Sequence, residues 1–375
     1  METVLSILLY TFIIIFMTFA SKWAFINKFE GKSYLLKGII TIFPALVAAM
    51  RESTGTDSQM YINSYYHLQE VAISRTNGFE IGYSLIVKLM NAFSLPHQFF
   101  FFFMNFVTIL CFVGFIENEK DNIDIRFSTF LFFINYYLLS FNAMRQGLAI
   151  AMDLYAYSQY EKKKYLKFLI LVLLSSTIHI SGLMALAIVP CDFAFKWWKI
   201  LYKLKKTITF SGIILGIFLV FNRKILASLV ALITNIDYAQ YILADLGKKS
   251  NPIYFVVMNV IPFLCVLIGY FNLPDKKIYN NYYILTIAGY ILTMLSLVTG
   301  TQGDRIGLNF QCLNLATLSN SIVLKTTIKA GNRRILIKKQ DKKILLYIFF
   351  AIIYSFNWFY KKNGGLVPYV PITKI

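Results

Sequence analysis

Residues 38–57 read GIITIFPALVAAMRESTGTD, an apolar run that ends abruptly in a polar cluster. An arginine at the edge of bilayer hydrocarbon is energetically expensive, so Arg51 is a candidate functional residue by default. Arg145, His179 and the pair Asp304 and Arg305 each lie at the end of another apolar run. The repeated pattern indicates a helical membrane protein whose polar groups gather at one face to bind an anionic, lipid-linked substrate.

The composition predicts the fold class. The chain has 375 residues, of which 58% are hydrophobic and 15% are charged. Apolar runs near ~20 residues match the ~30 Å thickness of bilayer hydrocarbon. A membrane β-barrel would instead show ~10-residue segments of alternating hydrophobicity. We therefore predict an all-α polytopic membrane protein that forms a single transmembrane domain over residues 1–375.

The positive charge has a simple interpretation. A soluble protein with a net charge of +19 would suggest a nucleic-acid partner. Here the cations lie in short loops between apolar runs, so they act as topology determinants and no nucleic acid is expected. About twelve spans are predicted, at residues 4–20, 38–50, 98–116, 127–141, 145–160, 166–178, 181–195, 207–221, 252–270, 282–299, 305–322 and 344–360.

These spans place 25 of the 37 Lys and Arg residues in the loops of one side, which is the cytoplasmic side by the positive-inside rule. Residues 323–343 form the most basic inside loop. The outside loops 51–97 and 222–251 are expected to be partly helical and to lie at the interface. All four polar sites then share the outer face.

The turn at 51–57 could bind phosphate. Gly55 allows a left-handed backbone and close approach. The planar fork of Arg51 matches phosphate oxygens bidentately. Asp57 has two open interpretations, a catalytic carboxylate or the cap of a helix that runs on through Tyr61.

The other sites use similar chemistry. Arg145 opens a span, and Asp153 lies ~12 Å deeper in the same helix, either protonated or paired with another helix. His179 offers a neutral imidazole suited to general base catalysis, although a structural role is equally open. Asp304 could cap a helix or orient Arg305.

No cofactor is expected. The sequence holds no Asp-x-Asp, His-Glu-x-x-His or paired-cysteine motif, so no metal site is predicted. The four cysteines are far apart and are expected to pack in the core. No nucleotide-binding glycine motif is present, so any sugar donor must already be activated in the membrane.

Three motifs resemble, in their order along the chain, the EpsG family of bacterial exopolysaccharide and O-antigen or capsule synthesis, which is related to Wzy-type polymerases. They lie at residues 51–61, 142–149 and 178–182. The hydrophobic profile is similar over nearly the whole chain. Arg305 resembles the family's late arginine, but Asn309-Phe310 stands where the family tends to place a tyrosine.

The resemblance implies a GT-C-like glycosyltransferase, metal-independent and inverting. It would lie in the bacterial plasma membrane with its active site facing the outside or periplasm. It would transfer a growing glycan from undecaprenyl diphosphate onto the next lipid-linked repeat unit. The implied partners are the undecaprenyl-diphosphate-linked oligosaccharides that act as donor and acceptor, membrane lipids, a chain-length regulator and a flippase.

Residue roles follow from this scheme. Arg145, with Arg51 and Arg305, would bind the pyrophosphate and stabilise the leaving group. His179, or alternatively Asp57, would remove the proton of the acceptor hydroxyl. Tyr61, with Tyr65 and Tyr66, would contact sugar rings.

Three alternatives stay open. An O-antigen ligase-type transferase would use the same pyrophosphate chemistry with another acceptor. A flippase or exporter should carry charges along a path reachable from both sides, often with internal repeats, and neither feature is seen in this sequence. A membrane acyltransferase has only His179 in its favour.

Overall fold

The computed structural model describes residues 2–26, 30–70, 79–193, 255–273, 277–299, 301–323, 326–330 and 333–372. The chain forms two compact units. Met1–Ala185 and Asn314–Ile375 make the first, and Leu186–Leu313 make the second. The predicted single domain is not tested by this division and stays a prediction.

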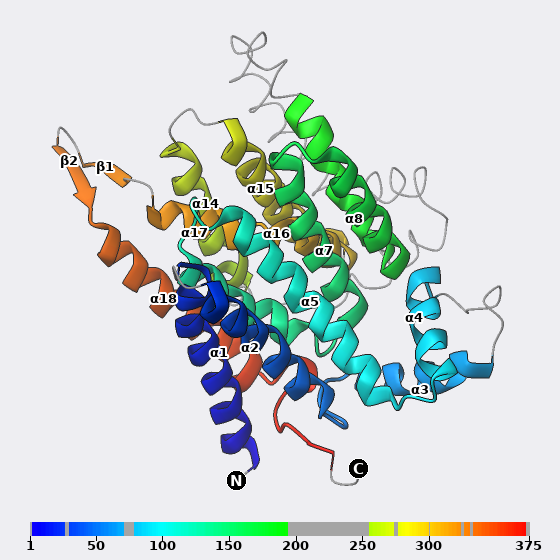
Figure 1. Ribbon diagram of the computed structural model, residues 1–375. Helices are drawn as coiled ribbons and strands as arrows, with labels where there is room; N and C mark the ends of the chain where they lie inside the picture. The colour runs from blue at the N-terminus through cyan, green and yellow to red at the C-terminus, as the bar shows by residue number, and fades with distance from the viewer. Residues whose placement is uncertain are drawn as a thin grey trace. The chain divides into compact units, whose positions relative to one another are not determined.

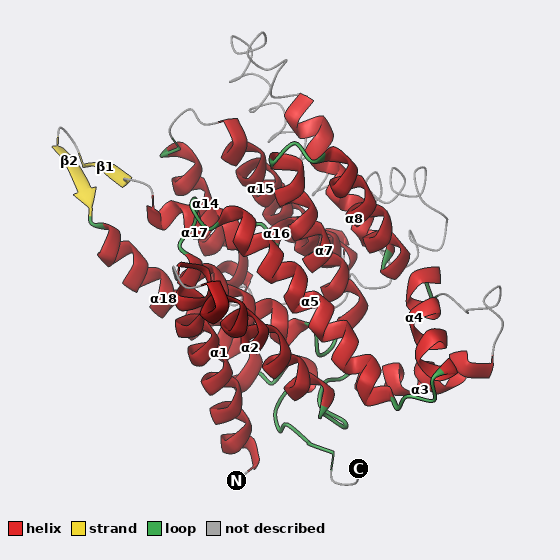
Figure 2. Ribbon diagram, in the orientation of Figure 1, coloured by secondary structure: helices red, strands yellow, loops and turns green. Residues whose placement is uncertain are grey.

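The first unit is built mainly from helices (Figures 1 and 2). In chain order its elements are α1 (Glu2–Ile26), α2 (Glu30–Ala49), α3 (Ser58–Glu70), α4 (Ile81–Ala92), α5 (His97–Glu119), α6 (Ile125–Leu131), the π-helix η2 (Phe132–Tyr137), α7 (Met144–Glu161), α8 (Tyr165–Ile178), α17 (Asn314–Val323), the strands β1 (Thr326–Ala330) and β2 (Arg333–Ile337), α18 (Lys339–Ser355), the π-helix η7 (Phe356–Tyr360) and the short 3-10 turn η8 (Asn363–Gly365).

The second unit contains the π-helix η6 (Val256–Val260) and the helices α14 (Ile261–Phe271), α15 (Lys277–Thr299) and α16 (Thr301–Gln311). The 3-10 helix η3 (Ile180–Ala187) crosses the boundary between the units. Within the second unit α15 packs against α16. Gly307 permits this close approach, because a Cβ there would lie 2.8 Å from the carbonyl oxygen of Gly289.

Four described helices are long and apolar enough to cross a membrane: Glu2–Ile26, Gly31–Ala49, His97–Glu119 and Lys339–Tyr360. The exposed side chains of α1 fit contact with lipid, since Leu8, Phe19 and Trp23 are 58%, 58% and 62% exposed. These helices are consistent with a membrane protein. The predicted total of about twelve spans is not confirmed in the part of the chain that the structure describes.

The core of the first unit surrounds α5. This helix packs against α2 and α7, and α7 packs against α8. Tyr83, Phe100, Phe101 and Met104 are completely buried in one aromatic cluster. That cluster packs α4 against α5.

The helix ends of the first unit gather into two groups. The end of α2 and the starts of α3, α4, α5 and α7 meet the end of α8 at one end of the unit. At the other end, Lys37 pairs with Glu117 at 2.7 Å, and Lys162 donates to Asn118 at 2.8 Å. Along α7 the two groups are about 25 Å apart.

Several sequence predictions can be compared with these elements. The helices expected inside loop 51–97 are confirmed as α3 and α4. The single span predicted at 305–322 is wrong, because α16 and α17 are separate helices with a break at Cys312 and Leu313. The break lies within apolar sequence, so hydropathy does not record it. The helix containing Arg305 starts at Thr301, which puts Asp304 inside its first turn and not at a cap.

The β-hairpin within loop 323–343 was not predicted. Its strands pair antiparallel, with Thr326 opposite Ile337 and Ala330 opposite Arg333. The predicted span 207–221 and the loop 222–251 lie outside the described residues.

Candidate functional site

The turn 51–57 is held by a distant part of the chain. Residues 363–372 return to it and form a strand-like ladder. The N–H of Glu52 donates to the carbonyl of Val370 at 2.9 Å, and the N–H of Gly55 donates to that of Gly365 at 3.0 Å. In the other direction, the N–H of Val370 donates to the hydroxyl of Thr54 at 2.7 Å. The tail therefore satisfies backbone groups that the turn itself leaves open.

Gly55 is required where the turn meets the loop before α7. Its φ is +100°, and a Cβ would lie 2.8 Å from the carbonyl oxygen of Phe141. The close approach brings the Thr56 hydroxyl to 3.0 Å from Asn142 Oδ1 and 3.1 Å from Asp57 Oδ1. The first and second sequence motifs are thus in direct contact.

Arg51 is fully buried at this junction. Its guanidinium lies over the rings of Phe101 and Phe141, at 4.7 and 4.3 Å from their centroids. Nη2 lies 3.9 Å from Met144 Sδ, while Nε and Nη1 have no hydrogen-bond partner among the described residues. Burial lowers the pKa of Arg51 to about 10, so the group still carries its charge at neutral pH. The two rings compensate part of the desolvation cost.

Arg145 has a different environment one residue beyond Met144. Its Nη1 forms an ion pair with Glu80 Oε2 at 2.5 Å, and both side chains are about one-fifth exposed, at 19% and 21%. The guanidinium also lies over Phe79 and Tyr83, at 4.8 and 5.3 Å from the ring centroids. Arg145 is therefore rigidly held but reachable.

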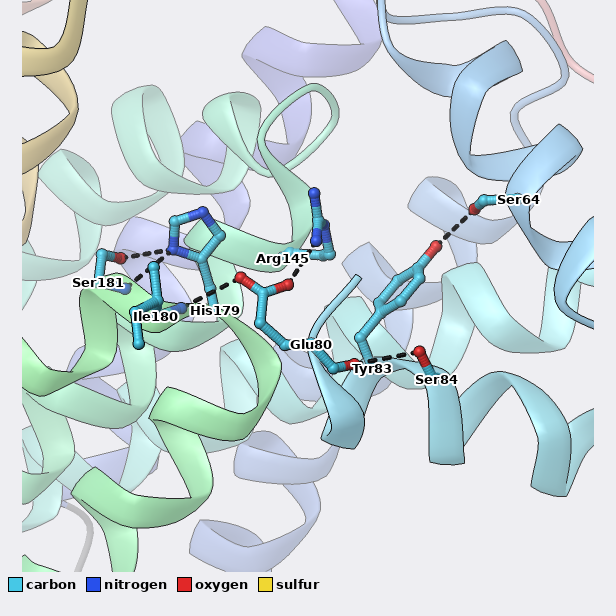
Figure 3. Close-up of polar contacts among 8 residues, drawn as sticks. All are labelled: Ser64, Glu80, Tyr83, Ser84, Arg145, His179, Ile180 and Ser181. Carbon is cyan, nitrogen blue, oxygen red and sulfur yellow. Dashed lines mark hydrogen bonds and ion pairs between the residues drawn. The ribbon is translucent and has the colours of Figure 1, made fainter. Parts of the chain in front are cut away.

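Glu80 joins three helices at one point (Figure 3). It occupies the N-cap position of α4, yet its carboxylate does not cap that helix. Oε2 binds Arg145 at the start of α7, and Oε1 accepts the N–H of Ile180 at 3.2 Å, just after α8. One carboxylate thus fixes the relative positions of the second and third sequence motifs.

His179 lies beside this junction at the end of α8 (Figure 3). Its Nδ1 is 2.7 Å from the Ser181 hydroxyl and accepts the Ser181 backbone N–H at 3.2 Å. Because Nδ1 accepts a backbone N–H, the neutral ring carries its proton on Nε2. In this tautomer the hydrogen-bond donor of the His179 ring is Nε2–H.

The structure brings together most of the predicted residues. Arg51, Asp57, Arg145 and His179 all lie at one end of the first unit. Asp57 immediately precedes α3 and is half-buried. Tyr61 is buried beside the backbone N–H groups of Met144 and Arg145.

The other tyrosines differ in exposure. Tyr65 is buried, with its hydroxyl donating to the carbonyl of Leu95 at 2.5 Å, whereas Tyr66 is 49% exposed. A sugar ring could therefore stack on Tyr66 without rearrangement, but not on Tyr65.

Asp304 and Arg305 belong to the second unit, on α16. Their predicted role beside the other arginines stays a prediction. Asp153 is completely buried in α7.

Sequence reasoning missed two parts of the site. Glu80 precedes Ile81-Gly82-Tyr83 in an outside loop, and an acidic residue in a mixed loop gives little signal by itself. The returning tail is the second omission, although its Gly364-Gly365 pair marks a turn. Among the described residues, no group of three acidic, histidine or cysteine side chains could hold a metal.

Comparison with known proteins gives one match. The chain belongs to the EpsG family, which it matches over residues 34–370. No curated protein and no solved structure matches it. The resemblance of the three motifs is therefore confirmed at the level of the family, and the family indicates a polysaccharide polymerase-like function.

Proposed function

We propose that this protein is a polysaccharide polymerase. It transfers a growing glycan from undecaprenyl diphosphate onto a lipid-linked repeat unit, at the outer face of the bacterial plasma membrane. The observation that carries the proposal is the junction of Arg145, Glu80 and the Ile180 N–H beside His179. It places a partly exposed cation, a carboxylate and an imidazole ring together at one helix end.

Arg145 binds the donor pyrophosphate in this proposal. A guanidinium suits this task because its fork matches phosphate oxygens and stabilises charge that develops on the leaving group. The pyrophosphate takes the place of Glu80 on Arg145. Arg51, next to Met144, adds positive charge without contacting the ligand.

The released Glu80 carboxylate is then the strongest candidate for the general base. His179 and Asp57 remain alternatives, but Nδ1 of His179 already accepts the Ser181 N–H. The acceptor hydroxyl oxygen forms a bond to the anomeric carbon, its proton passes to the base, and the bond from that carbon to the diphosphate breaks. The configuration at the anomeric carbon inverts in this step.

An apolar cavity supports a prenyl-linked donor. It measures about 580 Å³ and is lined by residues that include Met50, Tyr66, Phe99 and Ile372. Met50 and Ile372 flank the turn of Arg51, since the Ile372 N–H donates to the Met50 carbonyl at 2.9 Å. A lipid chain here would end close to the arginines.

The outward orientation is supported by charge. The candidate site lies at the opposite end of α7 from Lys162, Lys163 and Lys164, which belong to a predicted inside loop.

The test is glycan length in a strain whose only copy is wild type, Glu80→Gln or Arg145→Ala, at matched membrane levels. Glu52→Gln is the control, because Glu52 is an exposed carboxylate of the neighbouring turn. We expect both site variants to export single repeat units without long chains, and the control to make full-length glycan.

Other outcomes would overturn the proposal. Full-length glycan in both site variants would remove the junction from the chemistry. Repeat units retained on the inner face would indicate a flippase. Long chains that stay on their lipid carrier would indicate a ligase-type transferase.

A further inference from the structure

A cavity lined by basic side chains lies at the other end of the first unit. It measures about 460 Å³. Five cations line it: Lys22 of α1, Lys120 after α5, Arg126 of α6, and Lys339 and Lys343 of α18. Asp124 is the one carboxylate among its described lining residues. Segments more than 300 positions apart in sequence therefore bring like charges to one place.

The available carboxylates are already engaged. Asp124 Oδ1 accepts the N–H of Phe127 at 3.1 Å, and Oδ2 pairs with Lys343 at 2.6 Å. Glu117, next to the cavity, is shared between Lys120 at 2.6 Å and Lys37 at 2.7 Å. Asp124 and Glu117 are therefore already paired with other groups and do not neutralise the remaining cations of the cavity.

Three lining cations have no acidic partner among the described residues. Lys22, Arg126 and Lys339 form no ion pair with any residue that the structure describes. Arg126 lies over the ring of Phe19 at 5.6 Å, and its buried Nε has no hydrogen-bond partner in the described part of the chain. Like charges around one cavity repel each other, and a bound anion would remove that cost.

The position of the cavity relative to the bilayer indicates where the anion comes from. Three of the four membrane-length helices, α1, α5 and α18, end or begin at this cavity. Their ends mark the level of phospholipid headgroups. Ile26, Ile123 and Val323 supply apolar walls beside the cations. The cavity thus joins a positive headgroup site to an apolar surface.

We propose that this cavity binds the phosphate headgroup of an anionic phospholipid of the surrounding membrane. The lipid phosphate lies among Arg126, Lys22 and Lys339, and its glycerol and first methylenes lie against the isoleucines. Positive pockets between membrane helices on the cytoplasmic side suit this ligand. The site is about 25 Å from Arg145 along the helix direction and does not depend on glycosyl transfer.

The experiment uses the full-length protein in dodecyl maltoside. Its thermal unfolding is followed while phosphatidylglycerol or phosphatidylcholine of the same chain length is added. We expect phosphatidylglycerol to raise the Tm saturably and phosphatidylcholine to leave it unchanged. An equal shift with both lipids would overturn the proposal without need of any variant.

Variants locate the site. Arg126→Gln with Lys339→Gln should weaken the phosphatidylglycerol response about 10- to 30-fold in lipid concentration. Lys167→Gln, which removes an exposed cation of α8 on the same side, should retain the wild-type response. An unchanged response in the double variant would overturn the assignment of the cavity. If the double variant does not fold, Arg126→Lys replaces it. This variant keeps the charge but loses the planar guanidinium, and we expect a weaker response to phosphatidylglycerol than in the wild type.

Soluble phosphate compounds test whether the cavity binds a lipid headgroup or a free phosphate. Inorganic phosphate and glycerol phosphate at millimolar concentration are expected to leave the Tm unchanged, because they lack the apolar part. If either one stabilises the wild type as strongly as phosphatidylglycerol, and the double variant loses that effect, the cavity is a site for a soluble phosphate and the lipid proposal fails.

Discussion

Arg51 and Arg145 occupy neighbouring helix ends, and the same sequence argument selected both, yet their surroundings differ. Arg51 is enclosed between two phenylalanine rings, under a turn closed by the chain's own tail, and no described carboxylate pairs with it. Arg145 is paired with Glu80 and remains one-fifth exposed. An arginine at the end of a membrane helix can therefore support the structure of a site or be exposed to its ligand. The residues around it determine which of the two roles it has.

The largest expected effect distinguishes the exposed arginine. Arg145→Met should lower the polymerisation rate about 100-fold, because one stabilising donor to the leaving group is lost. Its Tm should change little, since partly exposed ion pairs contribute about 0–1 kcal/mol. The measurement is chain extension in membranes supplied with lipid-linked repeat units, beside thermal unfolding. Arg145→Lys keeps the charge without the fork and should fall between the two. If Arg145→Met does not fold, Arg145 supports the structure of the site, and the distinction drawn here between Arg145 and Arg51 is wrong.

The second effect concerns the turn around Arg51. Gly55→Ala should destabilise the protein by about 2–3 kcal/mol, because it strains a backbone at φ +100° and meets the Phe141 carbonyl. Gly38→Ala is the matched control, since a Cβ at this helical glycine would meet nothing within 4 Å. The control should be neutral or stabilising by up to about 1 kcal/mol. Equal Tm values for the two variants would show that the turn does not need its left-handed residue.

A third effect separates charge from packing at Arg51. Arg51→Met removes an unpaired buried cation and the two ring contacts together, so the stability should change by no more than about 1 kcal/mol. The polymerisation rate should fall about 10-fold if the cation acts on the pyrophosphate through space, a loss of ~1.4 kcal/mol. A large drop in Tm with unchanged activity per folded molecule would instead make Arg51 purely structural.

The smallest effect tests the contact of turn and tail. Thr54→Val removes the acceptor of the Val370 N–H and should cost about 1–2 kcal/mol, with a proportionate fall in Tm. Thr56→Val at the same turn leaves that acceptor in place and removes only the more exposed contacts of its hydroxyl with Asn142 and Asp57, so it should cost less. If Thr54→Val costs nothing, the tail is not coupled to the site.

Part of this arrangement could be predicted from the sequence. Apolar runs located α1, α2, α5, α7 and α8, because burial in lipid demands uninterrupted apolar helices. The three motifs were correctly expected to lie at the same end, since helix hairpins and loop charges fix their side. The role of Glu80 was not predictable, because its partners Arg145 and Ile180 lie 65 and 100 residues further on. The break at Cys312 was missed because the apolar sequence continues through it.

The tail that closes the Arg51 turn also sets an order of events. The Thr54 hydroxyl and the Val370 N–H that bind each other are separated by 316 residues of chain. Tyr10 and Ser6 of α1 hold the same tail through Leu366 and Tyr369. α1 and the turn are therefore synthesised long before the tail that binds them. The contacts that close the turn can form only after residues 363–372 have left the ribosome.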